Sequence, residues 1–276
     1  VSLAHLGEPT RHVTCLPANE LGETCVGTLA RWNVDTSAVV MDMSLDARMG
    51  LYFCERGASQ RASRVIYDRQ YSSFSRIKRG TFQWKQILHD ADWFHFTGIT
   101  PALSDEAAET ALEACHTAKK LGIGVSLDLN YRASLWPREK AGCTLRRYLS
   151  SIDVLFANNG SLYDVFGLDV SGSAYRNGPE ETLAAARETA ERFGIGRVAL
   201  TMRHSVSASR NEWAALLWDG REKKAFLSRR YVMDMVDRIG GGDSFAAGLL
   251  YAWRQQFPNA KAIEFAAASS CLKQTI

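Results

Sequence analysis

The amino-acid sequence predicts an α/β fold in which a mostly parallel central sheet is covered by helices on both faces. Short segments rich in β-branched and aromatic residues alternate with amphipathic helical segments along most of the chain. The strand-like segments, such as residues 154–157, are almost continuously apolar, which indicates strands buried on both faces. A chain of 276 residues with 46% hydrophobic residues is large enough to bury such a core.

The amino-terminal third predicts a helix, a strand, a second helix and a second strand, followed by a hairpin. The first four elements are expected at residues 1–7, 12–16, 20–32 and 38–41. Residues 51–55 and 64–69 alternate in polarity and flank a turn-rich segment, so they predict a hairpin with one exposed face. We expect this small β-sheet, at about residues 48–70, to lie apart from the main core.

The rest of the chain alternates regularly between strands and helices. Strands are expected at residues 93–96, 124–129, 154–157, 198–201, 213–218 and 230–236. Helices are expected at residues 105–121, 145–151, 178–193, 243–255 and 260–274. Ligands of such sheets bind beyond the carboxyl ends of the strands, so we expect the functional residues at that edge.

The composition argues against several classes of partner. The formal net charge is +3, and 33 basic and 30 acidic residues are spread along the chain without a block of one sign. We therefore expect no nucleic-acid partner and no membrane partner. The six cysteines form no metal-binding or redox pair, which is typical of free thiols in a reducing compartment, so we predict a cytoplasmic location. The chain starts without Met, and we expect segments to be missing at both ends.

The most informative segment is the glycine run that precedes the helix predicted at residue 243. Gly240, Gly241 and Gly242 would let the backbone approach an anion and direct N–H groups toward it, and the helix dipole would add to the attraction. Asp243 follows directly and could accept a proton from an attacking hydroxyl. An alternative for a bare run of this kind is a flexible turn with Asp243 as an ordinary helix cap.

Residues 236–248, Val-Asp-Arg-Ile-Gly-Gly-Gly-Asp-Ser-Phe-Ala-Ala-Gly, resemble the carboxy-terminal signature of the ribokinase-like (PfkB) carbohydrate kinases. The resemblance implies a three-layer ribokinase-like fold, with residues 1–276 forming a single kinase domain and the hairpin acting as a lid. It implies that Asp243 is the catalytic base and that Gly240–Gly242 form the anion hole. ATP and Mg²⁺ would be the cofactors.

Further segments are similar to the 2-keto-3-deoxygluconate kinase branch of that family. They are residues 16–22, 50–53, 65–69, 92–100 and 128–132. The resemblance implies a sugar-acid pocket lined by Tyr52, Tyr67, Arg69, Ile99 and Arg132. Arg132 follows a strand end, where its guanidinium could clamp a carboxylate bidentately. Taken singly, the tyrosines could be ordinary strand aromatics, Arg69 an exposed edge charge and Arg132 half of a salt bridge.

On the nucleotide side, the resemblance implies that ATP is bound by Thr201, Arg203, Ser205, Gly240 and Gly242, with the first three following a strand. The chain departs from the family at one point. The family usually has N-x-x-E after a central strand, with the Glu helping to place hydrated Mg²⁺, whereas this chain has Asn158-Asn159-Gly160-Ser161. The metal ligands are therefore unassigned.

Three functions remain open at this point. The leading hypothesis is phosphorylation of the terminal hydroxyl of 2-keto-3-deoxygluconate by ATP. A kinase of a neutral sugar, similar to fructokinase or ribokinase, is the first alternative, and Arg69 and Arg132 discriminate between the two. A catalytically silent sugar-binding module is the second, motivated by the absent acid at position 161. A dinucleotide dehydrogenase is disfavoured because the G-x-G-x-x-G spacing is absent. A homo-oligomer is a further hypothesis.

Overall fold

A computed structural model of the chain describes residues 1–169 and 178–276. Its central sheet has seven strands, in the order β12-β11-β10-β9-β8-β7, with β13 pairing with β11 as well. The strands are β7 (Trp93–Thr97), β8 (Gly124–Asp128), β9 (Val154–Ala157), β10 (Arg197–Ser205), β11 (Arg210–Asp219), β12 (Lys224–Leu227) and β13 (Tyr231–Asp234). β7 to β10 are parallel neighbours, and β11 is antiparallel to β10, β12 and β13. β11 therefore runs opposite to the other six strands of this sheet. The prediction of a mostly parallel sheet is confirmed.

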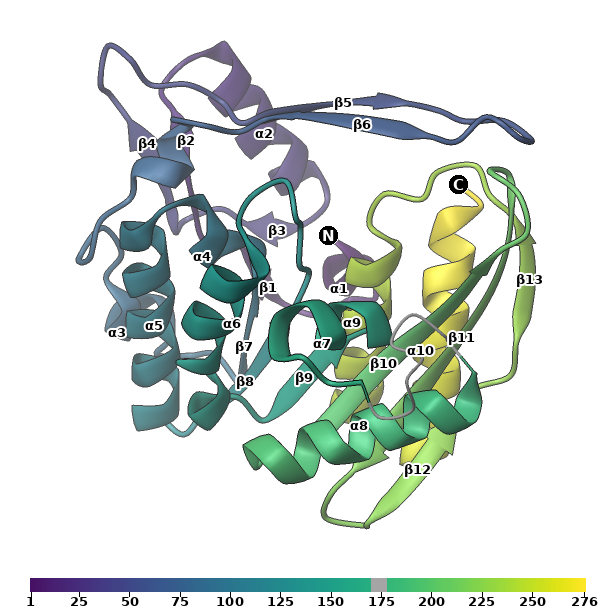
Figure 1. Ribbon diagram of the computed structural model, residues 1–276. Helices are drawn as coiled ribbons and strands as arrows, with labels where there is room; N and C mark the ends of the chain where they lie inside the picture. Colours follow the sequence, from purple (N-terminus) through teal and green to yellow (C-terminus); the bar gives the residue numbers. More distant parts are fainter. Residues whose placement is uncertain (170–177) are drawn as a thin grey trace.

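Helices cover both faces of this sheet (Figure 1). One face packs against α5 (Asp105–Lys120), α6 (Arg138–Arg146), α7 (Asn159–Phe166) and α8 (Pro179–Phe193). The other face packs against α9 (Gly241–Arg254) and α10 (Asn259–Gln274). Alternate strand residues divide between the two cores: Leu155 and Leu200 belong to the first, and Phe156 and Ala199 to the second. The expected three-layer arrangement is confirmed.

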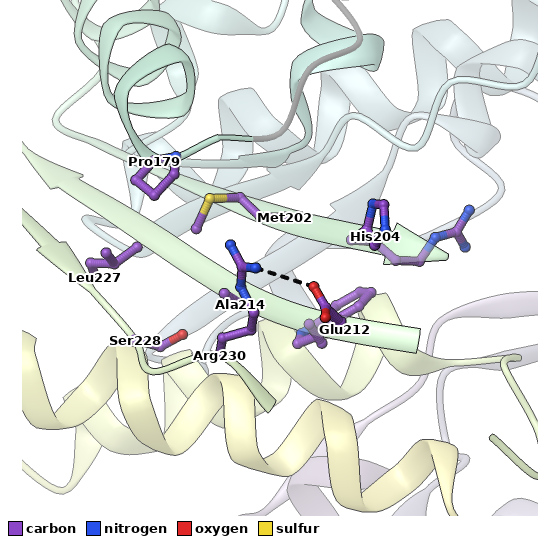
Figure 2. A pocket seen from close by; sticks show the side chains of 10 residues that line it. Pro179, Met202, His204, Glu212, Ala214, Leu227, Ser228 and Arg230 are labelled. Atoms are coloured by element: carbon purple, nitrogen blue, oxygen red, sulfur yellow. Dashed lines mark hydrogen bonds and ion pairs between the residues drawn. The ribbon is translucent and has the colours of Figure 1, made fainter. Parts of the chain in front are cut away.

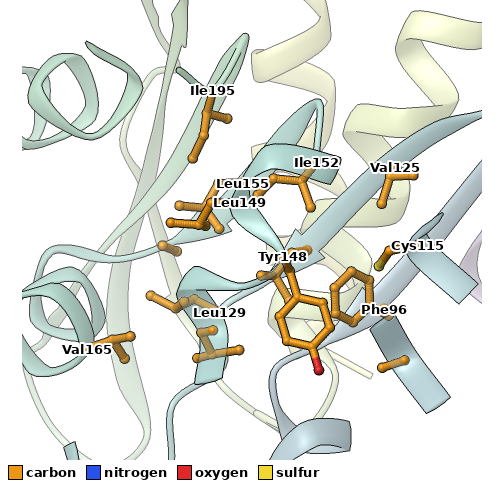
Figure 3. Close-up of a cluster of buried hydrophobic side chains, with 14 of the residues drawn as sticks. Phe96, Cys115, Val125, Leu129, Tyr148, Leu149, Ile152, Leu155, Val165 and Ile195 are labelled. Carbon is orange, nitrogen blue, oxygen red and sulfur yellow. The ribbon is translucent and has the colours of Figure 1, made fainter. Parts of the chain in front are cut away.

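Tyr148 lies in the first core, beside Phe96 of β7 (Figure 3). Its ring lies 5.3 Å from the ring of Phe96, and its hydroxyl donates a hydrogen bond of 2.7 Å to the carbonyl of Ala108. Burial of this phenol raises its pKa. The hydroxyl is thus satisfied inside an apolar core, where an unpaired polar group would be costly.

The amino-terminal part forms small parallel sheets beside the main one. β1 (Thr10–Arg11) pairs with β3 (Val34–Asp35), and β2 (Thr14–Pro17) pairs with β4 (Val39–Asp42). The helical elements here are α1 (Ser2–His5), α2 (Glu20–Arg31), η1 (Ser73–Arg76), α3 (Trp84–Ile87) and α4 (Ile99–Leu103). The Asn19 side chain begins α2 by accepting hydrogen bonds from the N–H groups of Leu21 and Gly22.

The predicted hairpin is present as β5 (Leu51–Glu55) and β6 (Arg64–Asp68), which pair antiparallel. It extends across the open side of the molecule, from the region of β2 and β4 toward the end of α10 and the turn joining β10 to β11 (Figure 1). The sequence predicts one exposed face, but nearly all residues of both strands are exposed. The hairpin therefore behaves as a ribbon over the site and not as one layer of a packed sheet.

The prediction of one helix over residues 145–151 is wrong. α6 ends at Arg146, and a separate short 3₁₀ helix, η2, spans Leu149–Ser151. The helical segment begins earlier, directly after Pro137, which has an extended backbone conformation suited to a helix start. Its buried residues, which include Ala141 and Leu145, are mostly small, so the apolar periodicity in this part of the sequence is weak.

Several short elements were missed, among them α7 and β12 of the main layers. α7 has clear end signals, with a capping box between Asn158 and Ser161 and a left-handed Gly167 at its end. β12 has four residues. Among the described residues, no helix is long and apolar enough to cross a membrane.

Candidate functional site

The glycine run forms a sharp turn into α9, at the edge of the sheet where the parallel strands end. Gly240 has φ 77°, a left-handed conformation that favours glycine, and it precedes the first helical residue. No side chain caps this helix. The N–H groups of its first turn therefore point outward, as in sites that bind phosphate.

The three glycines differ in their surroundings. A Cβ on Gly241 would lie 2.9 Å from the side chain of Gln274, so this glycine permits close packing of α9 on α10. A Cβ on Gly242 would meet nothing nearer than Asp128, whose Oδ2 would lie 4.0 Å away. Gly242 and Asp243 are both exposed. This side of the turn is therefore open to a ligand.

Asp128, the last residue of β8, lies opposite Asp243 across this opening. Partial burial, together with the negative charge of Asp243, raises the pKa of Asp128 to about 7, although Arg132 and the N–H of Asn130 act in the other direction. Two carboxylates thus face each other across the glycine run. A carboxyl with a strongly raised pKa in a cleft is a candidate functional group.

The sugar-acid residues predicted from the sequence come together at the root of the hairpin. Tyr52 and Tyr67 are paired across β5 and β6, with ring centres 6.5 Å apart. The Arg69 guanidinium lies 4.1 Å from the centre of the Tyr67 ring. Partial burial lowers the pKa of Arg69, and the positive charge of Arg132 lowers it further. Arg69 and Arg132 are therefore close in space although they lie on different elements.

Within the described part of the chain, neither Arg69 nor Arg132 forms an ion pair. Arg132 donates a hydrogen bond of 3.0 Å to the carbonyl of its neighbour Tyr131. The alternative interpretation of Arg132 as half of a salt bridge is thus wrong. Two neighbouring guanidiniums without a carboxylate partner are suited to binding an anion.

Ile99 lies at the end of β8 because the turn before it approaches that strand closely. Gly98 donates a hydrogen bond of 2.7 Å to the carbonyl of Asp128, and a Cβ on Gly98 would lie 2.3 Å from the carbonyl oxygen of Leu129. The side chain of Asn130 donates to the Thr97 hydroxyl at 3.0 Å. These contacts hold the start of α4, which is Ile99, against the end of β8.

The prediction that Thr201, Arg203 and Ser205 follow a strand is wrong, because β10 continues to Ser205. The strand is longer than its apolar part because β11 pairs with it through the whole polar stretch, up to Ser205 opposite Asn211. The three side chains alternate with Met202 and His204 and lie on one face of the strand. Partial burial lowers the pKa of Arg203, and the positive charges of Arg238 and Arg132 lower it further. Arg203 therefore lies in a cationic region beside the glycine run.

Position 161 carries a serine and not an acid, and in the structure Ser161 helps to cap the start of α7. The Asn158 side chain accepts from the N–H of Ser161 at 2.9 Å, and the Ser161 hydroxyl accepts from the N–H of Asn158 at 3.1 Å. This capping box starts α7. Among residues 1–169 and 178–276, no group of three or more His, Cys, Asp or Glu side chains could hold a metal ion.

One pocket of roughly 140 Å³ lies on the α8 side of β10 and β11 (Figure 2). Its lining includes Met202, Arg203 and Pro179, and an ion pair of 3.2 Å between Arg230 and Glu212 crosses it. It contains neither Asp243 nor any residue of the hairpin. The site around the glycine run therefore lies outside this pocket.

Two residues near the glycine run were not among the predicted site residues, namely Asp128 and Arg238. Asp128 ends a buried parallel strand at the edge where ligands of such sheets bind, which was a usable signal. Arg238 lies two residues before Gly240, and only its proximity to Arg203 in space reveals it.

The fold and this arrangement define a three-layer α/β protein with an uncapped helix start, of the kind that suits an anion, beside two carboxyl groups. The chain belongs to the pfkB family of carbohydrate kinases, since that family's sequence model matches residues 1–275. It is thus an enzyme that transfers a phosphoryl group to a sugar-like substrate.

Named relatives and a solved structure agree with this assignment. The chain is 31% identical over its whole length to 2-dehydro-3-deoxygalactonokinase of Haloferax volcanii, of which it covers 79%. It is 30% identical over 92% of its length to 2-dehydro-3-deoxygluconokinase of Thermoproteus tenax, of which it covers 70%. The crystal structure of 2-dehydro-3-deoxygluconokinase from Thermotoga maritima matches the whole chain and 82% of its own, with a TM-score of 0.94 and 40% identity.

Proposed function

We propose that this enzyme uses ATP to phosphorylate the terminal hydroxyl of a 2-keto-3-deoxy sugar acid, with 2-dehydro-3-deoxygluconate (2-keto-3-deoxygluconate) as the substrate. The observation that carries the proposal is the approach of Arg69 and Arg132, neither of which forms an ion pair with a described residue, beside Tyr52 and Tyr67. A carboxylate would accept charge-assisted hydrogen bonds from both guanidiniums, whereas the hydroxyl groups of a neutral sugar would accept weaker ones. The names of the relatives support a sugar acid of this class.

Asp243 is the proposed general base. Its carboxylate would accept the proton of the terminal hydroxyl as that oxygen attacks the γ-phosphate. The backbone of Gly240–Gly242 and the start of α9 would hold the transferring group, because outward N–H groups and the helix dipole favour negative charge. Tyr52, Tyr67 and Arg69 on the hairpin, with Ile99 and Arg132, would hold the sugar acid, and the hairpin would exclude water as a lid.

The nucleotide is proposed to bind along β10 and the glycine run. Arg203 and Ser205, with Thr201 deeper on the same face, would contact ATP together with Gly240 and Gly242. The facing carboxylates of Asp128 and Asp243 fit a hydrated Mg²⁺, which prefers oxygen ligands and retains several waters. Mg²⁺ supplies charge neutralisation of the phosphates when it is bound, and Asp128 and Asp243 are the residues that would hold it.

A coupled assay of ADP release tests the proposal. We expect turnover with 2-dehydro-3-deoxygluconate or its galacto epimer, and much lower kcat/KM with fructose or ribose. A kinase of neutral sugars would show the reverse preference. Absence of turnover with both acids would rule out the substrate.

A silent sugar-binding module is the second candidate, favoured by the single observation that Ser161, and not an acid, stands three residues after Asn158. Calorimetry separates it from the kinase. Binding of the sugar acid without any consumption of ATP would support the silent module, and ADP formation at stoichiometric excess over enzyme would exclude it.

A further inference from the structure

The hairpin of β5 and β6 is not held in place by burial. Every residue of β5 is exposed, and so are four of the five in β6. A two-stranded ribbon on its own is marginally stable in water. What holds the hairpin over the site must therefore act at its ends.

The root of the hairpin is tied to the adjoining chain. Arg48 donates to the carbonyl of Gln70 at 3.0 Å and pairs with the carboxylate of Asp68 at 2.5 Å. The N–H of Ser73 donates to the carbonyl of Arg48 at 2.9 Å. These contacts fix one end, and a ribbon fixed only there would be free to swing about its root.

The tip of the hairpin, residues 56–63, contacts a turn far away in the sequence. The N–H of Ser59 donates to the Ser209 hydroxyl at 3.0 Å, and the N–H of Ala208 donates to the carbonyl of Ser59 at 2.8 Å. Ser59 has φ 53°, a left-handed conformation in which both of its backbone groups take part in this contact. Ser59 and Ser209 are separated by 150 residues. The hairpin is thus held at its tip as well as at its root.

The tip is shaped in advance for this contact. Ala58 and Arg61 exchange two backbone hydrogen bonds of 3.0 Å. The N–H of Gly57 donates to the Ser63 hydroxyl at 2.9 Å, and a Cβ on Gly57 would lie 2.3 Å from the carbonyl oxygen of Arg61. The tip is therefore a compact turn that presents Ser59, and glycine is required to form it.

The receiving turn, residues 206–209, directly continues the strand proposed to contact nucleotide. The Ser207 hydroxyl accepts from the N–H groups of Ser209 at 3.2 Å and Arg210 at 3.0 Å, which orders the turn. The tip also faces the segment before the glycine run. The pKa of Asp237 is lowered although partial burial acts to raise it. The N–H of Ile239 and the Lys273 side chain lower this pKa, and the charge of Arg56, at the start of the tip, lowers it more weakly.

We propose that the contact of Ser59 with Ala208 and Ser209 is a latch that couples the nucleotide half of the site to the sugar-acid half. The same hairpin carries Tyr52, Tyr67 and Arg69 at its other end, so a docked tip keeps those side chains over the site. The identity of the two ligands rests on the proposed function, whereas the contact itself does not. A nucleotide that orders the 206–209 turn favours the docked tip, and by reciprocity the sugar acid that orders the hairpin favours nucleotide binding.

The contact between the tip and the 206–209 turn is weak enough to form and break reversibly. Each exposed hydrogen bond contributes little net free energy, because water competes for both partners. Two such bonds are enough to shift the population of the docked hairpin by roughly three- to tenfold. The hairpin can therefore open to admit substrate and close again when both ligands are present.

The test uses four variants of the full chain. Ser209→Ala removes the acceptor for the Ser59 N–H, and Ser209→Thr keeps a hydroxyl there. A tip-shortened variant replaces residues 56–63 by Asn-Gly, a two-residue turn that joins the paired residues Glu55 and Arg64 without disturbing the strands. Gln60→Ala is the matched control, since it truncates a polar side chain at the tip and leaves both latch hydrogen bonds in place.

Calorimetry gives the affinity for 2-dehydro-3-deoxygluconate with and without a non-hydrolysable ATP analogue. We expect the analogue to raise the affinity roughly three- to tenfold in the wild type, Gln60→Ala and Ser209→Thr. The factor should fall in Ser209→Ala and approach one in the tip-shortened variant. An undiminished factor in the tip-shortened variant would overturn the latch.

Hydrogen exchange separates failure of the latch from failure of the proposed substrate. If no sugar acid binds, the substrate is wrong, and exchange with the ATP analogue alone still decides the latch. We expect the analogue to slow exchange at residues 56–63 and 206–210 in the wild type, and to slow it less at residues 56–63 in Ser209→Ala. Unchanged exchange at both segments in the wild type would refute the coupling.

Discussion

The guanidinium of Arg69 lies 4.1 Å from the centre of the Tyr67 ring, under the influence of the positive charge of Arg132. This cation–π contact favours a position of the Arg69 side chain at the hairpin root that leaves its N–H donors available to a ligand. Arg132 comes from the segment after β8, so the pair depends on the hairpin lying over that strand end. This relationship leads to the first prediction.

Arg132→Ala and Arg69→Ala should each raise KM for the sugar acid by roughly ten- to a hundredfold, because each removes a charge-assisted hydrogen bond to the carboxylate. The kcat/KM for a neutral sugar should change little. Arg64→Ala is the control, since Arg64 lies on the same hairpin but its side chain points to the face opposite Tyr67. Equal loss for acid and neutral sugar would contradict the carboxylate clamp.

Asp243→Asn should reduce kcat by several orders of magnitude, because the amide cannot accept the proton of the attacking hydroxyl. The Asp243 side chain is exposed, so the melting temperature should stay close to that of the wild type. Asp234→Asn, at an exposed carboxylate on β13, serves as the matched control and should keep full activity. If Asp243→Asn retained most of its kcat, Asp243 would not be the base.

Asp128→Asn should alter the pH dependence of stability. The folded protein holds the proton of Asp128 up to a pKa of about 7, whereas the unfolded chain releases it near 4. The folded state therefore binds more protons between these values, so this group makes stability fall as the pH rises from about 4 to about 7. Thermal melts in EDTA, without ligands, should show Asp128→Asn gaining stability relative to the wild type at pH 8 and little at pH 4. No difference between the two pH values would show that the pKa of Asp128 is not raised in the folded protein.

Gly98→Ala should destabilise the protein by about 2 kcal/mol or more, because its Cβ would lie 2.3 Å from the carbonyl oxygen of Leu129 and push α4 from the end of β8. Gly27→Ala is the matched control. Its Cβ would meet nothing within 4 Å, and alanine in the middle of α2 should stabilise the helix by roughly 0.5–1 kcal/mol. Urea denaturation measures both. Equal effects would mean that the approach of Gly98 to β8 is not constrained.

The expected sheet and most helices were predictable because their apolar periodicity is strong. The segments predicted at residues 105–121 and 178–193 correspond to α5 and α8 within one residue at each end. Prediction failed where another element decides the outcome. The apolar part of β10 stops at Met202, yet the strand continues to Ser205 because β11 supplies partners for its backbone. A pairing of this kind carries no signal in the strand itself.

By itself, the sequence determined the class of fold, the glycine run before α9, and the residues that resemble a sugar-acid kinase. These features are local or periodic, and they follow from backbone freedom and the burial of apolar side chains. Only the tertiary structure decided that Asp128 faces Asp243, that Arg69 meets Arg132, and that Ser59 contacts Ser209. Charge repulsion, desolvation and exposed hydrogen bonds depend on which distant segments the fold brings together. A local sequence pattern does not predict which segments these are.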